Sequence, residues 1–177
     1  MEGSSGEAGS SQSTDSTGRE GAAVVYYSRT GHTHALSTEI ASLIDPDQVE
    51  RIRPRSRRPY WSWLLRSFVP GSTVDIEPMP TDFRDASALF LGTPKWTVSC
   101  PPVNEFLDRA RIDVVPIGVF VTYGGFDERR YAETLVDRIE TRGGDVRATL
   151  LVKDDRIGPD FDHGRVVSFC RSVLESR

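Results

Sequence analysis

Short apolar runs alternate along the chain with stretches in which apolar residues recur every three or four positions. The runs are rich in β-branched and aromatic residues, which is typical of buried strands, and they lie at 22–27, 49–52, 86–92, 114–122 and 146–152. The amphipathic stretches predict helices at 33–44, 102–110, 128–142 and 160–175. The resulting order is strand, helix, strand, a longer insert, and then strand and helix in alternation to the end.

This alternation predicts an α/β fold with a mostly parallel sheet, because each parallel crossover needs a helix to return the chain. Five strands, with a glycine turn in the first strand-to-helix connection, favour the doubly wound order 2-1-3-4-5 with helices on both faces. Strands 1 and 3 are then neighbours whose connections leave in opposite directions. A crevice opens above their carboxyl ends, so we expect a ligand site among the loops after strands 1, 3 and 4.

The first of these loops reads Ser28-Arg29-Thr30-Gly31-His32-Thr33 and leads directly into a predicted helix. A helix N-terminus attracts anions through its unpaired N–H groups and partial positive charge, and hydroxyl groups add further donors. Gly31 allows a positive φ and close approach of a ligand. The loop lacks the lysine of a nucleoside triphosphate loop and the three glycines of a dinucleotide fingerprint, so it favours a single terminal phosphate. The alternative is that its Ser and Thr residues only cap the helix.

The other two loops each bring small residues and an aromatic side chain to the same crevice. The loop after the third strand contains Thr93, Pro94, Lys95 and Trp96, and the loop after the fourth contains Tyr123, Gly124, Gly125 and Phe126. A flat ring such as isoalloxazine needs aromatic faces at stacking distance, and we predict that Trp96 and Tyr123 flank it. The alternatives are that Trp96 is a packing residue and that Tyr123-Gly-Gly is only a turn.

All three loops resemble those of flavodoxins. The phosphate-binding loop of that family reads Ser/Thr-x-Thr-Gly-x-Thr, and Ser28, Thr30, Gly31 and Thr33 match its defined positions. The other loops resemble GTP-x-W/Y…PP-x-x-x-FL and T-x-GG, with matches at Gly92, Thr93, Pro94, Trp96, Pro101, Pro102, Phe106, Leu107, Thr122, Gly124 and Gly125. The resemblance covers 22–177 apart from an insert at about 53–85. It implies a flavodoxin-like fold and a non-covalent FMN held by residues of the three loops.

The resemblance further implies an electron-transfer protein that shuttles electrons between redox partners, with the redox chemistry on the flavin and no catalytic side chain. Two alternatives stay open. One is a small NAD(P)H-dependent flavin oxidoreductase acting on a quinone, a haem precursor or a similar acceptor, and the other is a regulatory module of the same fold that has lost the flavin. A two-component receiver domain is excluded, because it needs acidic residues where this chain has Tyr26, Tyr27 and Ser28.

Composition sets the domain organisation and excludes several functions. The 177 residues suffice for one domain, and residues 1–21 lack Val, Ile, Leu, Phe, Trp and Tyr, so we expect a disordered tail before a domain at 22–177. That domain carries 21 basic and 22 acidic residues, which argues against nucleic-acid binding over its whole surface. No apolar run reaches about 20 residues and no signal peptide is evident, so we expect no membrane span and a cytoplasmic protein.

Cysteines and histidines give little sign of metal or thiol chemistry. Cys100 and Cys170 are far apart, and His32 and His34 do not share a helical face, so no metal site is expected. Cys100 lies in a predicted flavin loop, but no Lys, Arg or His adjoins it, which favours an incidental thiol over a redox thiol. We expect Asp127 and the neighbouring Glu128 to cap the helix after the third loop.

The segment 51–66 is strongly basic and interleaved with aromatic residues. It holds Arg51, Arg53, Arg55, Arg57, Arg58 and Arg66 beside Tyr60, Trp61 and Trp63. Arginine and aromatic residues are enriched at protein interfaces, which suggests a docking surface for an acidic redox partner. A membrane face or a nucleotide phosphate would also suit these charges, and the remaining alternative is a solvated loop followed by a short helix at 61–68. The oligomeric state does not follow from the sequence.

Overall fold

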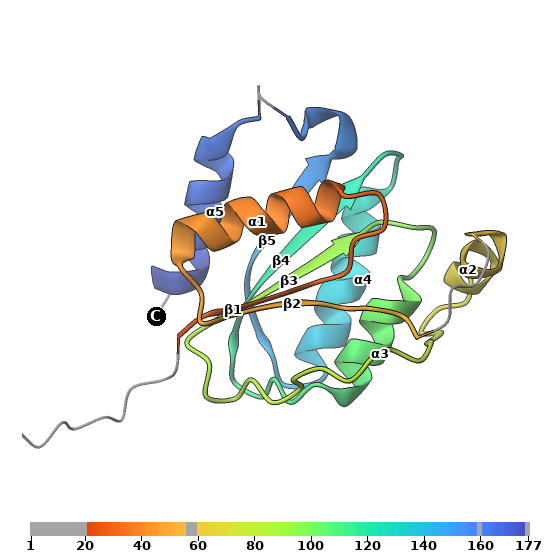
Figure 1. The fold of residues 1–177 in the computed structure, drawn as a ribbon, viewed down its shortest axis with the longest axis horizontal. Helices are drawn as coiled ribbons and strands as arrows, with labels where there is room; N and C mark the ends of the chain where they lie inside the picture. The colour runs from red at the N-terminus through yellow and green to blue at the C-terminus, as the bar shows by residue number, and fades with distance from the viewer. Residues whose placement is uncertain (1–20, 56–59, 159–160, 176–177) are drawn as a thin grey trace, which may run out of the picture.

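The computed structural model describes residues 21–55, 60–158 and 161–175. Five strands form one parallel sheet in the order β2-β1-β3-β4-β5 (Figure 1). They are β1 (Ala23–Tyr26), β2 (Gln48–Arg51), β3 (Leu89–Pro94), β4 (Pro116–Tyr123) and β5 (Asp145–Lys153). The predicted fold class and strand order are therefore confirmed. Residues 1–20, most of the expected tail, lie outside the described residues.

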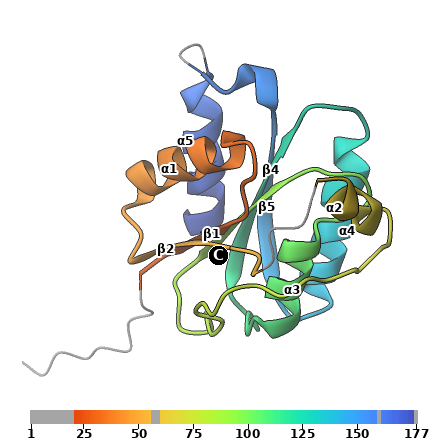
Figure 2. The ribbon, with the colours of Figure 1, turned by 45° about the vertical axis from the view of Figure 1, so that its right-hand side comes forward.

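Helices cover both faces of this sheet. They are α1 (His32–Ile44), α2 (Tyr60–Ser67), α3 (Pro101–Arg109), α4 (Glu128–Glu140) and α5 (His163–Glu175), with a 3-10 turn, η1 (Asp154–Arg156), after β5. Figures 1 and 2 show α1 and α5 on one face, α3 and α4 on the other, and α2 beyond the carboxyl ends of the strands on the α3 side. No helix in the described part of the chain is long and apolar enough to cross a membrane.

Alternate residues of the central strands build two separate cores. Val24 and Phe90 face the α1/α5 side, whereas Val25 and Leu91 face the α3/α4 side, and all four are fully buried. Burial on both faces explains why the central strands are continuous apolar runs, as expected for a covered parallel sheet. The sheet is therefore a rigid platform whose carboxyl edge positions the loops.

Several predicted boundaries are wrong. The third strand begins at Leu89 instead of residue 86, because the Ala86 N–H closes a turn on the Phe83 carbonyl. The fourth begins at Pro116, after Val114, which has a φ of 56° and is exposed. The last helix begins at 163. Three apolar residues of the helices are exposed: Leu43, Val167 and Leu174.

Candidate functional site

The loop between β1 and α1, called here the phosphate loop (residues 28–33), ends at the helix cap. Gly31 is the N-cap of α1, has a φ of 101°, and makes no side-chain capping hydrogen bond. A Cβ at Gly31 would meet no atom within 4 Å, so backbone conformation and not space demands glycine here. The structure does not show the capping role considered for Ser and Thr, and the first amides of α1 are left to a ligand or water.

The hydroxyl groups of the phosphate loop have different environments. The Ser28 side chain is 2% exposed, and its Oγ is buried without a hydrogen-bond partner. The Thr33 hydroxyl is 2.8 Å from the Thr122 hydroxyl at the end of β4, and Thr30 is exposed. A buried hydroxyl without a partner is costly, so Ser28 is the group that an incoming acceptor oxygen would satisfy. The donor set at this helix N-terminus fits a phosphate group.

One residue outside the phosphate loop contacts it directly. Arg51, the last residue of β2, donates a hydrogen bond from Nη2 to the Ser28 carbonyl at 2.8 Å. A separate contact joins β1 to α1: the Tyr26 hydroxyl lies 2.7 Å from Nδ1 of His34, and the two rings stack with centroids 5.5 Å apart. The sequence placed Arg51 only in the docking segment, and its contact with the loop was missed.

The β3–α3 loop (residues 95–100) is tied to β4, because the Lys95 N–H donates to the Thr122 carbonyl at 2.7 Å. Trp96 is half-buried and packs edge-on against Tyr27, with centroids 5.8 Å apart. Trp96 therefore packs against Tyr27 on one side of its ring, as the alternative interpretation expected. Thr93 is fully buried, and its hydroxyl contacts the Tyr131 hydroxyl and the Pro94 carbonyl, so this side chain belongs to the core.

The β4–α4 loop (residues 124–127) is open to solvent at the same edge. Phe126 is 87% exposed, Gly124 and Gly125 are exposed, and Tyr123 is half-buried. The Lys95 ammonium lies 5.9 Å from the centre of the Phe126 ring, so the two loops meet across the sheet edge. Asp127 is the N-cap of α4, but its carboxylate makes no capping hydrogen bond, so the expected side-chain cap is wrong.

One acidic residue at this edge was missed by the sequence analysis. Asp154 of η1 lies with Oδ1 3.4 Å from Nδ1 of His32. That oxygen is buried and has no hydrogen-bond partner, and Oδ2 is 3.3 Å from the position of a Cβ on Gly124. Asp154 therefore lies between the phosphate loop and the β4–α4 loop. The ligand site was expected among the loops after strands 1, 3 and 4, whereas the parallel pairing of Tyr123 with Lys153 brings the end of β5 to the same place.

The insert between β2 and β3 is attached to the β3–α3 loop. The Ser67 carbonyl accepts hydrogen bonds from the N–H groups of Val98 and Ser99, and its hydroxyl is 2.7 Å from that of Thr97. The short helix at 61–68, which the solvated-loop alternative included, is present as α2 at Tyr60–Ser67. Arg57 and Arg58 of the predicted docking segment lie outside the described residues. The insert thus borders the predicted ring site.

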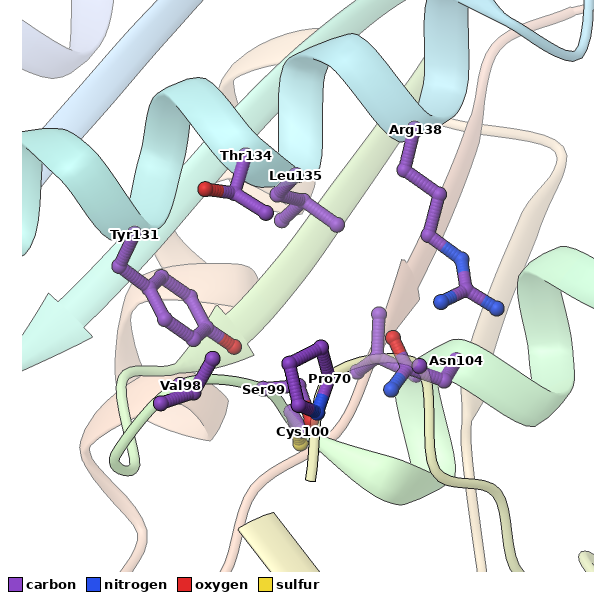
Figure 3. Close-up of a pocket in the computed structure, with 11 residues that line it drawn as sticks. Pro70, Val98, Ser99, Cys100, Asn104, Tyr131, Thr134, Leu135 and Arg138 are labelled. Carbon is purple, nitrogen blue, oxygen red and sulfur yellow. The ribbon is translucent and has the colours of Figure 1, made fainter. Parts of the chain in front are cut away.

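A cavity of about 350 Å³ lies on the α3/α4 side, between α4 and the β3–α3 loop (Figure 3). Tyr131 and Arg138 reach into this region from α4, and Cys100 and Asn104 line it from the other side. Burial raises the pKa of the Cys100 thiol to about 12, which supports an incidental thiol and not a reactive one. Among the residues that the structure describes, none from the phosphate loop lines this cavity. Within the same residues, no three His, Cys, Asp or Glu side chains gather to hold a metal ion.

A protein from Archaeoglobus fulgidus, described as uncharacterized, is 39% identical to this chain over 109 residues. The matched region covers 61% of this chain and 69% of that relative. No protein-family model matches the sequence.

Solved structures with the same architecture are flavodoxin-like. A Bacteroides uniformis protein assigned as a flavoprotein is 15% identical with a TM-score of 0.70, covering 86% of this chain and 98% of its own. A flavoprotein in complex with FMN from Lactobacillus acidophilus is 16% identical with a TM-score of 0.60, covering 77% and 94%. Flavodoxin 2 from Bacillus cereus is 15% identical with a TM-score of 0.58, covering 87% and 97%. These similarities show that the fold is flavodoxin-like.

Proposed function

The chain belongs to the same protein family as the Archaeoglobus fulgidus protein and has a flavodoxin-like fold, and on this premise we propose that it binds FMN non-covalently and passes electrons between redox partners. The observation that carries the proposal is the buried, unpartnered Ser28 hydroxyl beside the N-terminus of α1. The solved flavoprotein in complex with FMN lends support at the level of the fold.

The phosphate loop would hold the terminal phosphate. The Ser28 hydroxyl donates to one phosphate oxygen, the exposed Thr30 hydroxyl adds a donor, and the first amides of α1 bind the remaining oxygens. Arg51 keeps the Ser28 carbonyl turned toward its guanidinium, away from the anion. The cradle thus selects a phosphorylated ligand over its dephosphorylated form.

The β3–α3 and β4–α4 loops would line the flat ring. Phe126 has most of its surface free to pack, and Trp96 and Tyr123 are half-buried at the same edge. When bound, the flavin supplies the one-electron steps. The role of the chain is to bury the phosphate, hold the ring and set the charge around it, and acidic residues nearby, such as Asp127, disfavour additional negative charge on the ring.

A partner surface fits beside this edge. Four apolar side chains on α2 and the neighbouring loops are exposed: Leu65, Phe68, Val69 and Val98. Exposed arginines, including Arg53 and Arg55, lie in the same insert. We propose that this α2 surface, defined by these six residues, docks an acidic redox protein, because apolar centres with charged rims are typical of such interfaces.

The experiment is an absorbance spectrum of the purified protein with and without added FMN, followed by an assay of NAD(P)H oxidation. A bound flavin spectrum without steady NAD(P)H oxidation supports an electron carrier. Steady oxidation by the isolated protein supports the flavin-dependent oxidoreductase instead. A protein that takes up no flavin would be the regulatory module of the same fold, and the proposal would be wrong.

A further inference from the structure

We propose that His32 and Asp154 form a charge-compensated clamp on the FMN phosphate, in which Asp154 holds the His32 ring and the ring binds the phosphate with both of its nitrogens protonated. This inference rests on the proposed FMN site and adds a residue from η1 to it. The two side chains meet at 3.4 Å, between Nδ1 of His32 and Oδ1 of Asp154.

The position of His32 places its ring at the phosphate. It is the first residue of α1, directly after Gly31, so its own amide is among those that face an anion at this end. Its Nδ1 lies 3.2 Å from the Thr30 hydroxyl as well as near Asp154. With Nδ1 turned to these two groups, Nε2 is left to donate to a phosphate oxygen when the ring carries both protons.

Asp154 favours the protonated form of the ring. Its side chain is 32% exposed, but Oδ1, the oxygen nearest His32, is buried without a hydrogen bond, beside the place where a second anion would bind. A phosphate dianion beside an uncompensated carboxylate is repelled, whereas an imidazolium between them attracts both. Asp154 is therefore a positioning residue that holds the ring of His32 and stabilises its charge.

The other ionisable groups nearby have separate partners or places. His34 is bonded to the Tyr26 hydroxyl, and Lys153 pairs with Asp155. Arg29 lies in the phosphate loop and acts on the Tyr27 phenol, together with Arg51. As a guanidinium, Arg29 adds attraction for an anion without adding pH dependence.

The pH dependence has a definite sign. A phosphate monoester loses its second proton near pH 6, so above about pH 7 the phosphate is a dianion. The clamp holds this dianion only while the His32 ring carries both protons. The dissociation constant for FMN should therefore rise as pH rises from 6.5 to 8.5, while that for riboflavin should stay constant.

The experiment measures dissociation constants of FMN and riboflavin by flavin fluorescence quenching from pH 6.5 to 8.5. The proteins are the wild type, His32→Gln, Asp154→Asn and the control His34→Gln. We expect the wild type and His34→Gln to lose FMN affinity as pH rises. His32→Gln should bind FMN weakly with little pH dependence. Asp154→Asn should bind FMN more weakly than the wild type, because the His32 ring loses the carboxylate that holds it.

Two outcomes separate this inference from the proposed function. FMN binding by the wild type that does not change with pH, or a His32→Gln profile as steep as the wild type, would overturn the clamp and leave FMN binding intact. No FMN binding at any pH would overturn the proposed function, and the clamp with it.

Discussion

The guanidinium of Arg51 donates a hydrogen bond to the backbone carbonyl of Ser28, with 2.8 Å between Nη2 and the oxygen. This contact joins the end of β2 to the phosphate loop. The two segments are neighbours because Tyr26, near the start of the loop, pairs with Arg51 in the sheet. It fixes the peptide that carries the unpartnered Ser28 hydroxyl.

Arg51→Met should therefore weaken FMN binding about fivefold, which corresponds to about 1 kcal/mol for a partly exposed charged hydrogen bond. Riboflavin binding should change less, because it has no phosphate. The control is Arg53→Met, an exposed arginine two residues further along. Equal effects of both variants on FMN titrations would show that overall charge, and not this hydrogen bond, matters.

Gly31→Ala should lower the free energy of unfolding by about 1–2 kcal/mol, because alanine is strained at a φ of 101°. It should also weaken FMN binding if relaxation of that strain moves the first amides of α1. Gly125→Ala is the matched control, since its Cβ would meet no atom within 4 Å and its φ is not positive. Urea denaturation followed by circular dichroism measures the difference, and unchanged stability of Gly31→Ala would contradict the backbone argument.

The two aromatic residues Trp96 and Phe126 should respond differently to truncation. Trp96→Ala should lower the free energy of unfolding by about 2 kcal/mol, because the half-buried ring packs on Tyr27. Phe126→Ala should leave stability within about 0.5 kcal/mol, since the ring is 87% exposed, yet weaken FMN binding about tenfold. Stability is measured in urea without FMN and affinity by fluorescence. FMN affinity unaltered in Phe126→Ala would place the ring elsewhere.

Cys100 should be unreactive in the folded protein. Its pKa is raised from 9 to about 12 by burial, so at pH 8 almost none of it is thiolate. The unfolded thiol ionises first as pH rises, so this group's contribution to stability is complete below about pH 9 and declines above it. Ellman's reagent at pH 8 should label Cys100 only after urea unfolds the chain. Rapid labelling of Cys100 in the native protein would contradict this prediction and would support a redox role for the thiol.

Reversal of charge on the α2 surface, in Arg53→Glu with Arg55→Glu, should slow electron transfer from an acidic [2Fe-2S] ferredoxin several-fold at low salt. The flavin spectrum should be unchanged, and the wild-type rate should fall as salt is added. Arg171→Glu on α5, on the other face of the sheet, is the control. A rate indifferent to both salt and the double variant in stopped-flow measurements would mean that these arginines are only solvated. Loss of the flavin would mean that the insert covers the cofactor.

The sheet and the three loops could be predicted because they depend on local patterns. Continuous apolar runs indicate covered strands, and the Gly31 turn is visible as a glycine before a helix. Asp154 could not be found this way, since its place beside His32 arises from the pairing of β5 with β4 and the turn that follows. Arg51 was assigned only to the docking surface for a related reason. Its basic neighbours in the sequence indicated a solvent-exposed segment, and only the register of β2 brings its side chain to Ser28. The cavity near Tyr131 depends on how the insert packs on α3 and α4, which no local pattern encodes.

The most direct test of the account is a side-by-side titration of the wild-type protein with FMN and riboflavin, followed by flavin fluorescence. The phosphate loop supplies donors for the phosphate, which riboflavin lacks. We therefore predict that one FMN binds per chain with strong quenching of its fluorescence. Its dissociation constant should be at least about tenfold lower than that of riboflavin. Equal affinities for the two flavins, or binding of neither, would contradict the assignment of residues 28–33 as a phosphate site.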